Sequence, residues 1–361
     1  MPEHRRAYSE GLSRTGDDSG VDGRGEEQDK GKMVTQQDVA ERANVSTTTV
    51  SHVINETRFV SKELRERVYT AMEELDYQPN AIARSLRRKR TEQIGVILPD
   101  IAYPFLAEVA GGVEEAGHRM GYKIIFCASH QDAEKELACL NLARSKQVDG
   151  IMFLGAGPGS RHLKALVERG TPAVSCNRRF EDVQIDSVTA DNVQAGLEAT
   201  SHLIGLGHHR VGCIAGRDDI PISRQRLDGY RSALKELGIP VRDTLIVQDD
   251  FGNRGGYDAM NRLLGLPEPP TAVFACNDLM AMGAICAASK RRLRVPEDVA
   301  VIGCDDIALA AFTNPSLSTM ALPKRELGTR ALELLVRRIE DGDQPVERQV
   351  LPVRLVVRDS C

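Results

Sequence analysis

The 361-residue chain contains no run of about 18 apolar residues, the length that a transmembrane helix requires, so we expect no membrane span. Residues 2–20 read PEHRRAYSEGLSRTGDDSG and lack the apolar segment of a secretory signal, which favours a cytoplasmic protein. The net charge is −5, so there is no overall basic excess. Any site for nucleic acid must therefore be local.

Paired cysteine motifs are also missing. The eight cysteines are scattered without a C-x-x-C pair, and most lie in apolar runs such as IIFCAS and VGCIAG. Such positions are typical of buried, reduced thiols. We therefore expect neither disulfides nor a cysteine metal site.

Motifs of phosphate binding and catalysis are absent as well. The chain has no G-x-x-x-x-G-K-[ST], no H-E-x-x-H and no G-x-S-x-G, and GAGPG at 155–159 lacks the spacing of a dinucleotide-binding turn. The sequence therefore predicts no enzyme and no cofactor.

The N-terminal part changes character at Met33. Residues 1–32 are almost entirely polar and glycine-rich, and they cannot bury enough apolar surface to fold, so we expect a disordered tail. Met33, where the first patterned segment begins, is an alternative start of translation.

Three short helices are predicted after this tail. TQQD at 35–38 matches a capping box, Ser46 and Ser61 suit helix N-caps, and Asn44 and Val45 fit a short turn. Such an arrangement is a helix-turn-helix. Its expected apolar positions are Val39, Ala40, Ala43, Val50, Val53, Ile54, Leu64, Val68, Ala71, Met72 and Leu75.

The second of these helices contains three consecutive threonines, which are poor helix formers. Opposite its apolar stripe, the helix carries Thr47, Thr48, Ser51, His52 and Asn55. Short donors and acceptors of this kind suit base edges and phosphates in the DNA major groove. The alternative is a merely solvated face.

A basic segment follows at 77–91, YQPNAIARSLRRKRT. Arg84, Arg87, Arg88, Lys89 and Arg90 occur there without any acid. A linker is the alternative, but directly after a helix-turn-helix we favour contacts with phosphates. Leu86 is apolar among these cations and resembles the wedges that some proteins insert into the minor groove.

From residue 92, apolar runs alternate with helical patterns, which is typical of doubly wound parallel sheets. Two such series indicate two α/β lobes with a ligand cleft at the carboxyl ends of the strands. The runs are IGVILPD, KIIFCAS, GIMFLGA, AVSCN and SVTAD in the first series, and HRVGCIAG, LIVQDD, TAVFACND and VAVIGCDD in the second.

Several of these segments resemble the lac and galactose repressor family: DVAERANVSTTTVSHVIN, ARSLRRKRT, PTAVFACNDLMAMGA, RVPEDVAVIGCDD and PSLST at 315–319. The head segment, with TRFV at 57–60, is most similar to the purine-repressor branch. The resemblance covers about residues 33–361 and implies a DNA-binding repressor that acts as a homodimer, with a tetramer as the alternative. It would bind a palindromic operator and respond to a small-molecule effector.

The resemblance also implies a domain division. A helix-turn-helix would span 33–79 and a hinge helix 80–91, followed by a core at 92–361 that resembles periplasmic binding proteins. In this core, lobe 1 would take about 92–191 and 323–350, and lobe 2 about 192–322 and 351–361.

Individual site residues follow from the same resemblance. On the DNA side it implies Thr47, Thr48, Ser51, His52, Asn55 and Arg58, with Leu86 as the minor-groove wedge and Arg87 beside it. In the effector cleft it implies Phe105, Asn177, Arg178, Asp191, Ile220, Ile222, Arg226, Phe251, Asn277 and Asp305.

Arg226, Asn277 and Asp305 are our strongest effector candidates, because a guanidinium, an amide and a carboxylate suit the hydroxyls of a sugar. The alternatives are that Asn277 holds a turn and that Asp305 caps a helix. Ile220 and Ile222 stand where the purine-repressor branch has an arginine and a threonine. An apolar pair does not hydrogen-bond a purine edge, so we favour a sugar or sugar-derived inducer over a purine corepressor.

Two rival functions share the expected core. A periplasmic solute receptor would have a similar two-lobed core, but residues 33–90 and the absence of a signal sequence argue against it. An enzyme that acts on a sugar would also use Asp, Asn and Arg side chains in a cleft, but no pair of nucleophile and base stands out.

Overall fold

The structure is a computed structural model, and it describes residues 34–55, 57–78, 90–130, 132–145, 147–155, 161–178, 180, 182–342 and 344–361. The chain divides into two compact units, residues 1–80 and 81–361. The predicted tail and most of the predicted hinge helix, with Leu86 and Arg87, lie outside the described residues. No helix in the described ranges is both long and apolar enough to cross a bilayer.

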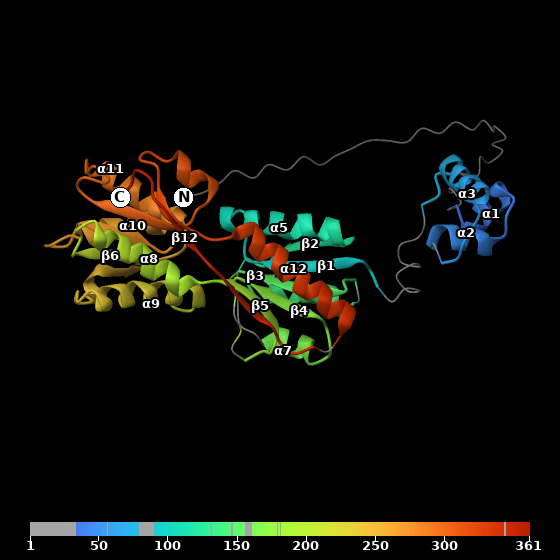
Figure 1. The fold of residues 1–361 in the computed structure, drawn as a ribbon, viewed down its shortest axis with the longest axis horizontal. Helices are drawn as coiled ribbons and strands as arrows, with labels where there is room; N and C mark the ends of the chain where they lie inside the picture. Colours follow the sequence, from blue (N-terminus) through green and yellow to red (C-terminus); the bar gives the residue numbers. More distant parts are fainter. Residues whose placement is uncertain are drawn as a thin grey trace, which may run out of the picture. The chain divides into compact units, whose positions relative to one another are not determined.

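The first unit contains the predicted helix-turn-helix (Figure 1). Its helices are α1 (Gln36–Ala43), α2 (Thr47–Asn55) and α3 (Lys62–Glu74). The capping box of Thr35 and Asp38 begins α1, and the Ser46 and Ser61 hydroxyls accept backbone N–H bonds at the starts of α2 and α3. The buried residues of this unit are Val39, Ala40, Ala43, Val50, Val53, Val68 and Ala71.

The turn between α1 and α2 is fixed from α3. Asn44 ends α1 with a left-handed backbone, φ 51°, which asparagine tolerates better than most residues. Arg67 of α3 donates through Nη2 to the carbonyl oxygens of Ala43 at 2.6 Å and Asn44 at 3.0 Å. The third helix therefore holds the angle at which α2 leaves the turn.

The second unit contains two sheets, and the first, sheet A, has the strand order β11-β5-β4-β3-β1-β2 with parallel pairing throughout. Helices α5 and α12 lie side by side over one face of it (Figure 1). The strands are β1 (Gln93–Leu98), β2 (Lys123–Ala128), β3 (Gly150–Leu154), β4 (Ala173–Cys176), β5 (Asp186–Ala190) and β11 (Arg348–Leu351). The helices are α5 (Pro104–Met120), α6 (Ala133–Arg144), α7 (Arg161–Val167) and α12 (Lys324–Asp341).

Sheet B has the order β12-β10-β9-β8-β6-β7, and only β12 in it runs antiparallel to its neighbour. Its strands are β6 (Val211–Ala215), β7 (Ile246–Gln248), β8 (Ala272–Ala275), β9 (Ala300–Asp305), β10 (Ser318–Ala321) and β12 (Arg354–Val356). Its helices are α8 (Asn192–Gly205), α9 (Pro221–Glu236), α10 (Asn253–Leu264) and α11 (Asp278–Lys290). The short 3-10 turns are Asp243–Leu245 and Ala308–Phe312.

The doubly wound α/β architecture is thus confirmed, and every predicted apolar run forms one of the strands β1 to β9. The chain passes between the two sheets at three places: after β5, after β10 and between β11 and β12. Each sheet, with the helices that cover it, is called lobe A or lobe B below. Neither lobe is made from one continuous stretch of chain.

Three helix pairs pack with their backbones in contact. A Cβ atom built on Gly229 of α9 would lie 2.1 Å from the Val193 carbonyl oxygen of α8, and one on Gly196 of α8 would lie 2.0 Å from the Arg226 carbonyl oxygen. No real side chain fits at these distances. Reciprocal glycines occur in the same way in α5 and α12 (Gly112, Gly328) and in α10 and α11 (Gly256, Gly283).

Candidate functional site

The polar face of α2 lies opposite its buried Val50 and Val53. Thr47 and Thr48 are exposed on this face, and so is Arg58 in the following loop. The three remaining candidates, Ser51, His52 and Asn55, are partly exposed.

Hydrogen bonds stabilise side chains on the polar face of α2. The His52 Nδ1 atom lies 2.7 Å from the Thr57 hydroxyl, and the Asn55 amide donates to the Ser51 carbonyl at 2.7 Å. Packing and capping hold the helix, so the poor helix propensity of its threonines is tolerated. The face can offer short polar groups to a duplex.

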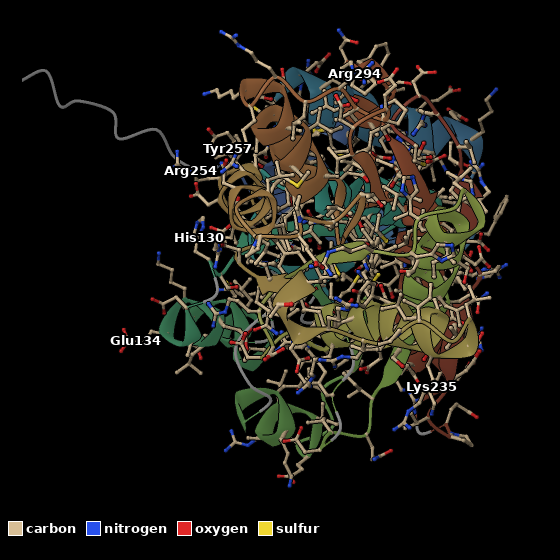
Figure 2. The ribbon with its side chains drawn as sticks, turned by 90° about the vertical axis from the view of Figure 1, so that its left-hand side faces the viewer. His130, Glu134, Lys235, Arg254, Tyr257 and Arg294 are labelled. Atoms are coloured by element: carbon tan, nitrogen blue, oxygen red, sulfur yellow. The ribbon has the colours of Figure 1, made fainter. Side chains whose placement is uncertain are left out.

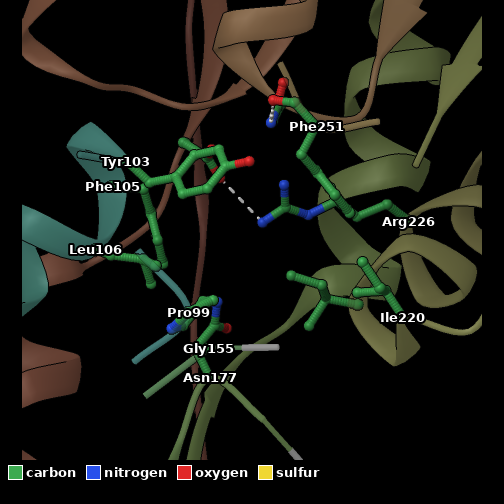
Figure 3. Close-up of a pocket in the computed structure, with 12 residues that line it drawn as sticks. Pro99, Tyr103, Phe105, Leu106, Gly155, Asn177, Ile220, Arg226 and Phe251 are labelled. Carbon is green, nitrogen blue, oxygen red and sulfur yellow. Dashed lines mark hydrogen bonds and ion pairs between the residues drawn. The ribbon is translucent and has the colours of Figure 1, made fainter. Parts of the chain in front are cut away.

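A cavity lies between the carboxyl ends of the strands of the two sheets (Figure 3). Its volume of about 80 Å³ is well below that of most small-molecule sites, so a ligand requires the lobes or side chains to move. The lining residues are Pro99, Tyr103, Phe105, Leu106, Gly155, Asn177, Ile220, Ile222, Arg226, Phe251, Asn277 and Asp305.

Arg226 is the central charge of this cavity. Its side chain is 2% exposed, and Nη2 lies 3.0 Å from Asp305 Oδ1. Nε donates to Asn192 Oδ1 at 2.9 Å, and Nη1 donates to the Cys276 carbonyl. Burial raises the pKa of Asp305 to about 6, and the Arg226 guanidinium limits this rise. The two groups form a buried ion pair at the wall of the cavity.

The backbone at the end of β9 turns sharply. Asp305 and Asp306 have φ values of 131° and 53°, which are unusual for residues other than glycine. Lys324 lies at the start of α12 in lobe A. Its Nζ donates to the backbone carbonyl oxygen of Asp305 at 2.9 Å and also to that of Asp306. Arg358 binds the Asp306 carboxylate at 2.7 Å. A cation of lobe A therefore holds the corner of lobe B that carries Asp305.

Asp278 supports this corner from within lobe B. It is fully buried, and its carboxylate accepts the Ile307 N–H at 2.8 Å and the Thr319 hydroxyl at 2.5 Å. Burial raises the pKa of Asp278 to about 7, and the charge of Asp305 contributes to this rise. The Asp278 carboxyl group therefore titrates at a pH at which the unfolding of the protein can be measured.

This shift predicts a pH effect for Asp278→Asn. The folded protein holds the Asp278 proton more tightly than the unfolded chain, so its contribution to the free energy of unfolding falls as pH rises from about 4 to 7. Asp278→Asn should lack this pH-dependent contribution to the free energy of unfolding, which changes by at most about 1.4 kcal/mol per pH unit. Urea unfolding at several pH values measures both slopes. Equal slopes in the two proteins would contradict the assignment.

Most of the effector residues inferred from the sequence line the cavity: Phe105, Asn177, Ile220, Ile222, Arg226, Phe251, Asn277 and Asp305. Arg178 and Asp191 do not belong to its lining. Arg178 pairs with Glu136 at 3.6 Å and lies 4.2 Å from the Phe180 ring centroid. Asp191 accepts the Gln194 N–H at 2.9 Å and caps α8.

Asn277 lines the cavity, but its amide is also used within the protein, where it caps a helix, the role given above as the alternative for Asp305. Its Oδ1 accepts the Met280 N–H at 2.7 Å and caps α11, while its Nδ2 donates to the Phe251 carbonyl at 2.9 Å. The amide thereby holds the loop that carries the Phe251 ring. Asp305, in contrast, directs its carboxylate to Arg226.

Four lining residues were not foreseen: Pro99, Tyr103, Leu106 and Gly155. All of them follow β1 or β3 or begin α5. The rule that ligands bind beyond the carboxyl ends of parallel strands points to the same positions.

Comparisons with known proteins agree with this architecture. Residues 35–80 match the family described as bacterial regulatory proteins, lacI family, and residues 200–361 match the periplasmic binding protein-like domain. The HTH-type transcriptional repressor PurR of Photobacterium profundum is 38% identical over 331 residues, which are 91% of this chain and 98% of that protein. PurR of Proteus mirabilis is 40% identical over 335 residues, which are 91% and 97% of the two chains.

Solved structures of transcriptional regulators are also similar to this chain. A complex of the transcriptional regulator CelR with cellobiose has a TM-score of 0.71 and 33% identity, covering 91% of this chain and all of that one. The lac repressor dimer bound to operator and the anti-inducer ONPF has a TM-score of 0.83 and 28% identity, covering 91% and 99%.

Proposed function

Because this chain belongs to the lacI family of bacterial regulatory proteins and is a DNA-binding transcriptional repressor, we propose that a sugar or sugar derivative in the cavity controls its binding to a palindromic operator. The buried pair of Arg226 and Asp305, which lines the cavity from lobe B, carries this proposal. A ligand that competes for either group would disturb the corner at Asp305, which Lys324 of lobe A holds, and would thereby couple the cavity to the arrangement of the lobes and to DNA binding.

The chemistry of the cavity supports a sugar. A carboxylate and a guanidinium can bind vicinal hydroxyls, and the rings of Phe105 and Phe251 can cover the apolar face of a pyranose. The similar structure of CelR contains cellobiose. Turnover of the sugar is not part of the proposal, since the relatives are repressors and we infer no enzymatic activity.

A purine corepressor is the second candidate, because the relatives named PurR are 38% to 41% identical to this chain. Ile220 and Ile222 argue against it, since both line the cavity with apolar side chains. A purine edge would leave its donors and acceptors unpaired there.

The remaining organisation is proposed from the same family membership. We infer a cytoplasmic homodimer with the head at 33–79, the hinge segment at 80–91 and the two-lobed core at 92–361. The two heads would dock in successive major grooves, and Leu86 with Arg87 would enter the minor groove at the centre of the operator. Thr47, Thr48, Ser51, His52, Asn55 and Arg58 would contact DNA.

Thr48→Ala tests the recognition face. A base contact is worth about 1–3 kcal/mol, so the operator dissociation constant should rise roughly 5-fold to 100-fold. Binding to unrelated DNA should change little. Thr70→Ala, at an exposed position of α3, is the matched control and should leave both affinities unchanged. Fluorescence anisotropy with a labelled palindrome measures them, and an equal loss on both DNAs would argue against base recognition.

The deciding experiment is operator binding by the purified protein with pentoses, hexoses, nucleosides and purine bases. Release by a sugar supports the proposal. Tighter binding with hypoxanthine or guanine would replace it by the purine corepressor.

A further inference from the structure

The DNA-binding part of the chain joins the core at residues 90–93, called the junction below, and Asp149 binds to this junction. Its Oδ1 atom accepts the Thr91 N–H at 2.7 Å and the Thr91 hydroxyl at 2.9 Å. Its Oδ2 atom accepts the Glu92 N–H at 2.9 Å. The Asp149 N–H donates in turn to the Gln93 carbonyl oxygen at 2.8 Å. One residue, directly before β3, therefore binds three successive residues where the chain enters the core.

Glu92 redirects the backbone at the junction. Its φ is 56°, in the left-handed region that residues other than glycine seldom adopt. Its N–H is bonded to Asp149, and its carbonyl oxygen accepts the N–H of Lys123, the first residue of β2, at 2.9 Å. An uncommon backbone conformation persists where its surroundings determine it from several sides. The bonds at Glu92 therefore fix a turn that precedes β1.

The last turn of α12 contacts the junction from a second side. Arg90 donates through Nη2 to the Ile339 carbonyl oxygen at 3.4 Å, and its Nη1 atom lies 3.8 Å from Glu340 Oε1. The side chains of Arg90 and Glu340 are partly exposed, so this ion pair contributes little free energy by itself. Lys324 begins the same helix and holds the corner of lobe B described above. The two ends of α12 thus contact the junction and the wall of the cavity.

The bonds at the junction exceed what the pairing of β1 requires. This strand already pairs with β2 and β3 along its length. The additional bonds act on residues 90–92, which precede the strand and end the basic segment of the sequence. In a homodimer, two such junctions determine where the two DNA-binding segments leave the core. The distance and rotation between the two half-sites of a palindrome must match this geometry.

We propose that Asp149 is a positioning residue for operator recognition, which fixes the direction in which the DNA-binding segment leaves lobe A and thereby selects the spacing of the operator half-sites. Asp149 contacts no DNA in this proposal and acts through Thr91 and Glu92. The inference rests on the repressor function and on the homodimer, and it does not depend on the identity of the effector.

Operators with altered spacing test this role. Fluorescence anisotropy of the full chain compares the palindrome that wild type binds most tightly with versions whose half-sites lie one and two base pairs further apart. Two added base pairs rotate one half-site by about 70° relative to the other, so wild type should bind that version roughly tenfold more weakly or worse. In Asp149→Ala the difference should be less than about threefold, because a junction that is no longer fixed reaches both spacings. Binding to unrelated DNA should stay the same.

The ratio of the affinities for the two spacings separates positioning from stability. A variant that merely unfolds more easily has less active protein, which lowers binding to every palindrome by the same factor. An unchanged ratio in Asp149→Ala overturns the proposal, whatever the absolute affinities. Thr91→Val decides the question if Asp149→Ala does not fold, because valine keeps the shape of threonine and loses only the bonds of the hydroxyl. Its ratio should be smaller than that of wild type, and an equal ratio would overturn the proposal.

Asp341→Ala is the matched control for the lost charge. Asp341 is exposed at the end of α12, next to the residues that contact Arg90. Its loss removes one negative charge, as Asp149→Ala does, and a weaker repulsion of phosphates acts on every palindrome alike. The ratio should therefore remain that of wild type. A ratio that falls as far in Asp341→Ala as in Asp149→Ala would show that charge causes the effect, and the proposal would be wrong.

Discussion

Replacing Arg226 by methionine is expected to lower the free energy of unfolding by about 3–5 kcal/mol, the usual cost of breaking one side of a buried ion pair. The side chain is 2% exposed, and its loss leaves Asp305, Asn192 and the Cys276 carbonyl without their donor. The variant should also lose its response to effector, because the pair lies at the wall of the cavity. Urea unfolding and operator binding with ligand measure the two effects.

Arg224→Met is the matched control, since Arg224 is exposed on the same helix, as is Lys235, whose side chain is labelled in Figure 2. We expect it to change the free energy of unfolding by less than about 0.5 kcal/mol. Adding Asp305→Asn to Arg226→Met should recover part of the loss, because the uncompensated buried carboxylate is then removed. A double variant that is less stable than the single one would show that the ion pair is not the source of the effect.

Gly229→Ala is expected to destabilise the core by on the order of 3 kcal/mol, at the upper end of the range for overpacking. The added methyl group would lie 2.1 Å from the Val193 carbonyl oxygen and 2.6 Å from the Leu197 nitrogen. These are backbone atoms of α8, which cannot rotate away as a side chain would. The helices must separate, and apolar contacts along their whole interface weaken. Thermal unfolding measures the loss.

Gly205→Ala provides the control within the same helix pair. Gly205 is the last residue of α8, and a Cβ atom there meets nothing within 4 Å. Alanine has the better helix propensity, so this change should be neutral or stabilise by up to about 1 kcal/mol. Equal losses for Gly205→Ala and Gly229→Ala would indicate that lost glycine flexibility, and not the close approach of the helices, causes the effect.

The elements of this fold were predictable because their signals are local. Thr35 with Asp38 and Ser46 with Thr49 mark helix starts within three residues, and the strands β1 to β9 are short apolar runs. The strands β10 to β12 do not stand out as apolar runs in the sequence, and they were not predicted. The edge strands β11 and β12 are only partly buried, and they obtain their pairing from segments far away in the sequence, such as β5 and β10.

Side-chain direction in the cavity was harder to predict. Asn177 and Arg178 are neighbours after β4, yet Asn177 faces the cavity while Arg178 reaches Glu136 of α6. Sequence places both residues at a strand end, but the backbone turn there decides which side chain points inward. Asn277 shows a second limit, since its position is in the cavity while its amide is used by Met280 and Phe251.

The three passages of the chain between the sheets bear on how the protein is made. Sheet A needs β11 at 348–351 and sheet B needs β12 at 354–356, so both remain incomplete until these residues have left the ribosome. The head at residues 34–78 can fold long before that point. A nascent chain can therefore contain all residues of the head while both sheets of its core still lack an edge strand. Loss of residues 348–361 alone would leave both sheets without an edge strand.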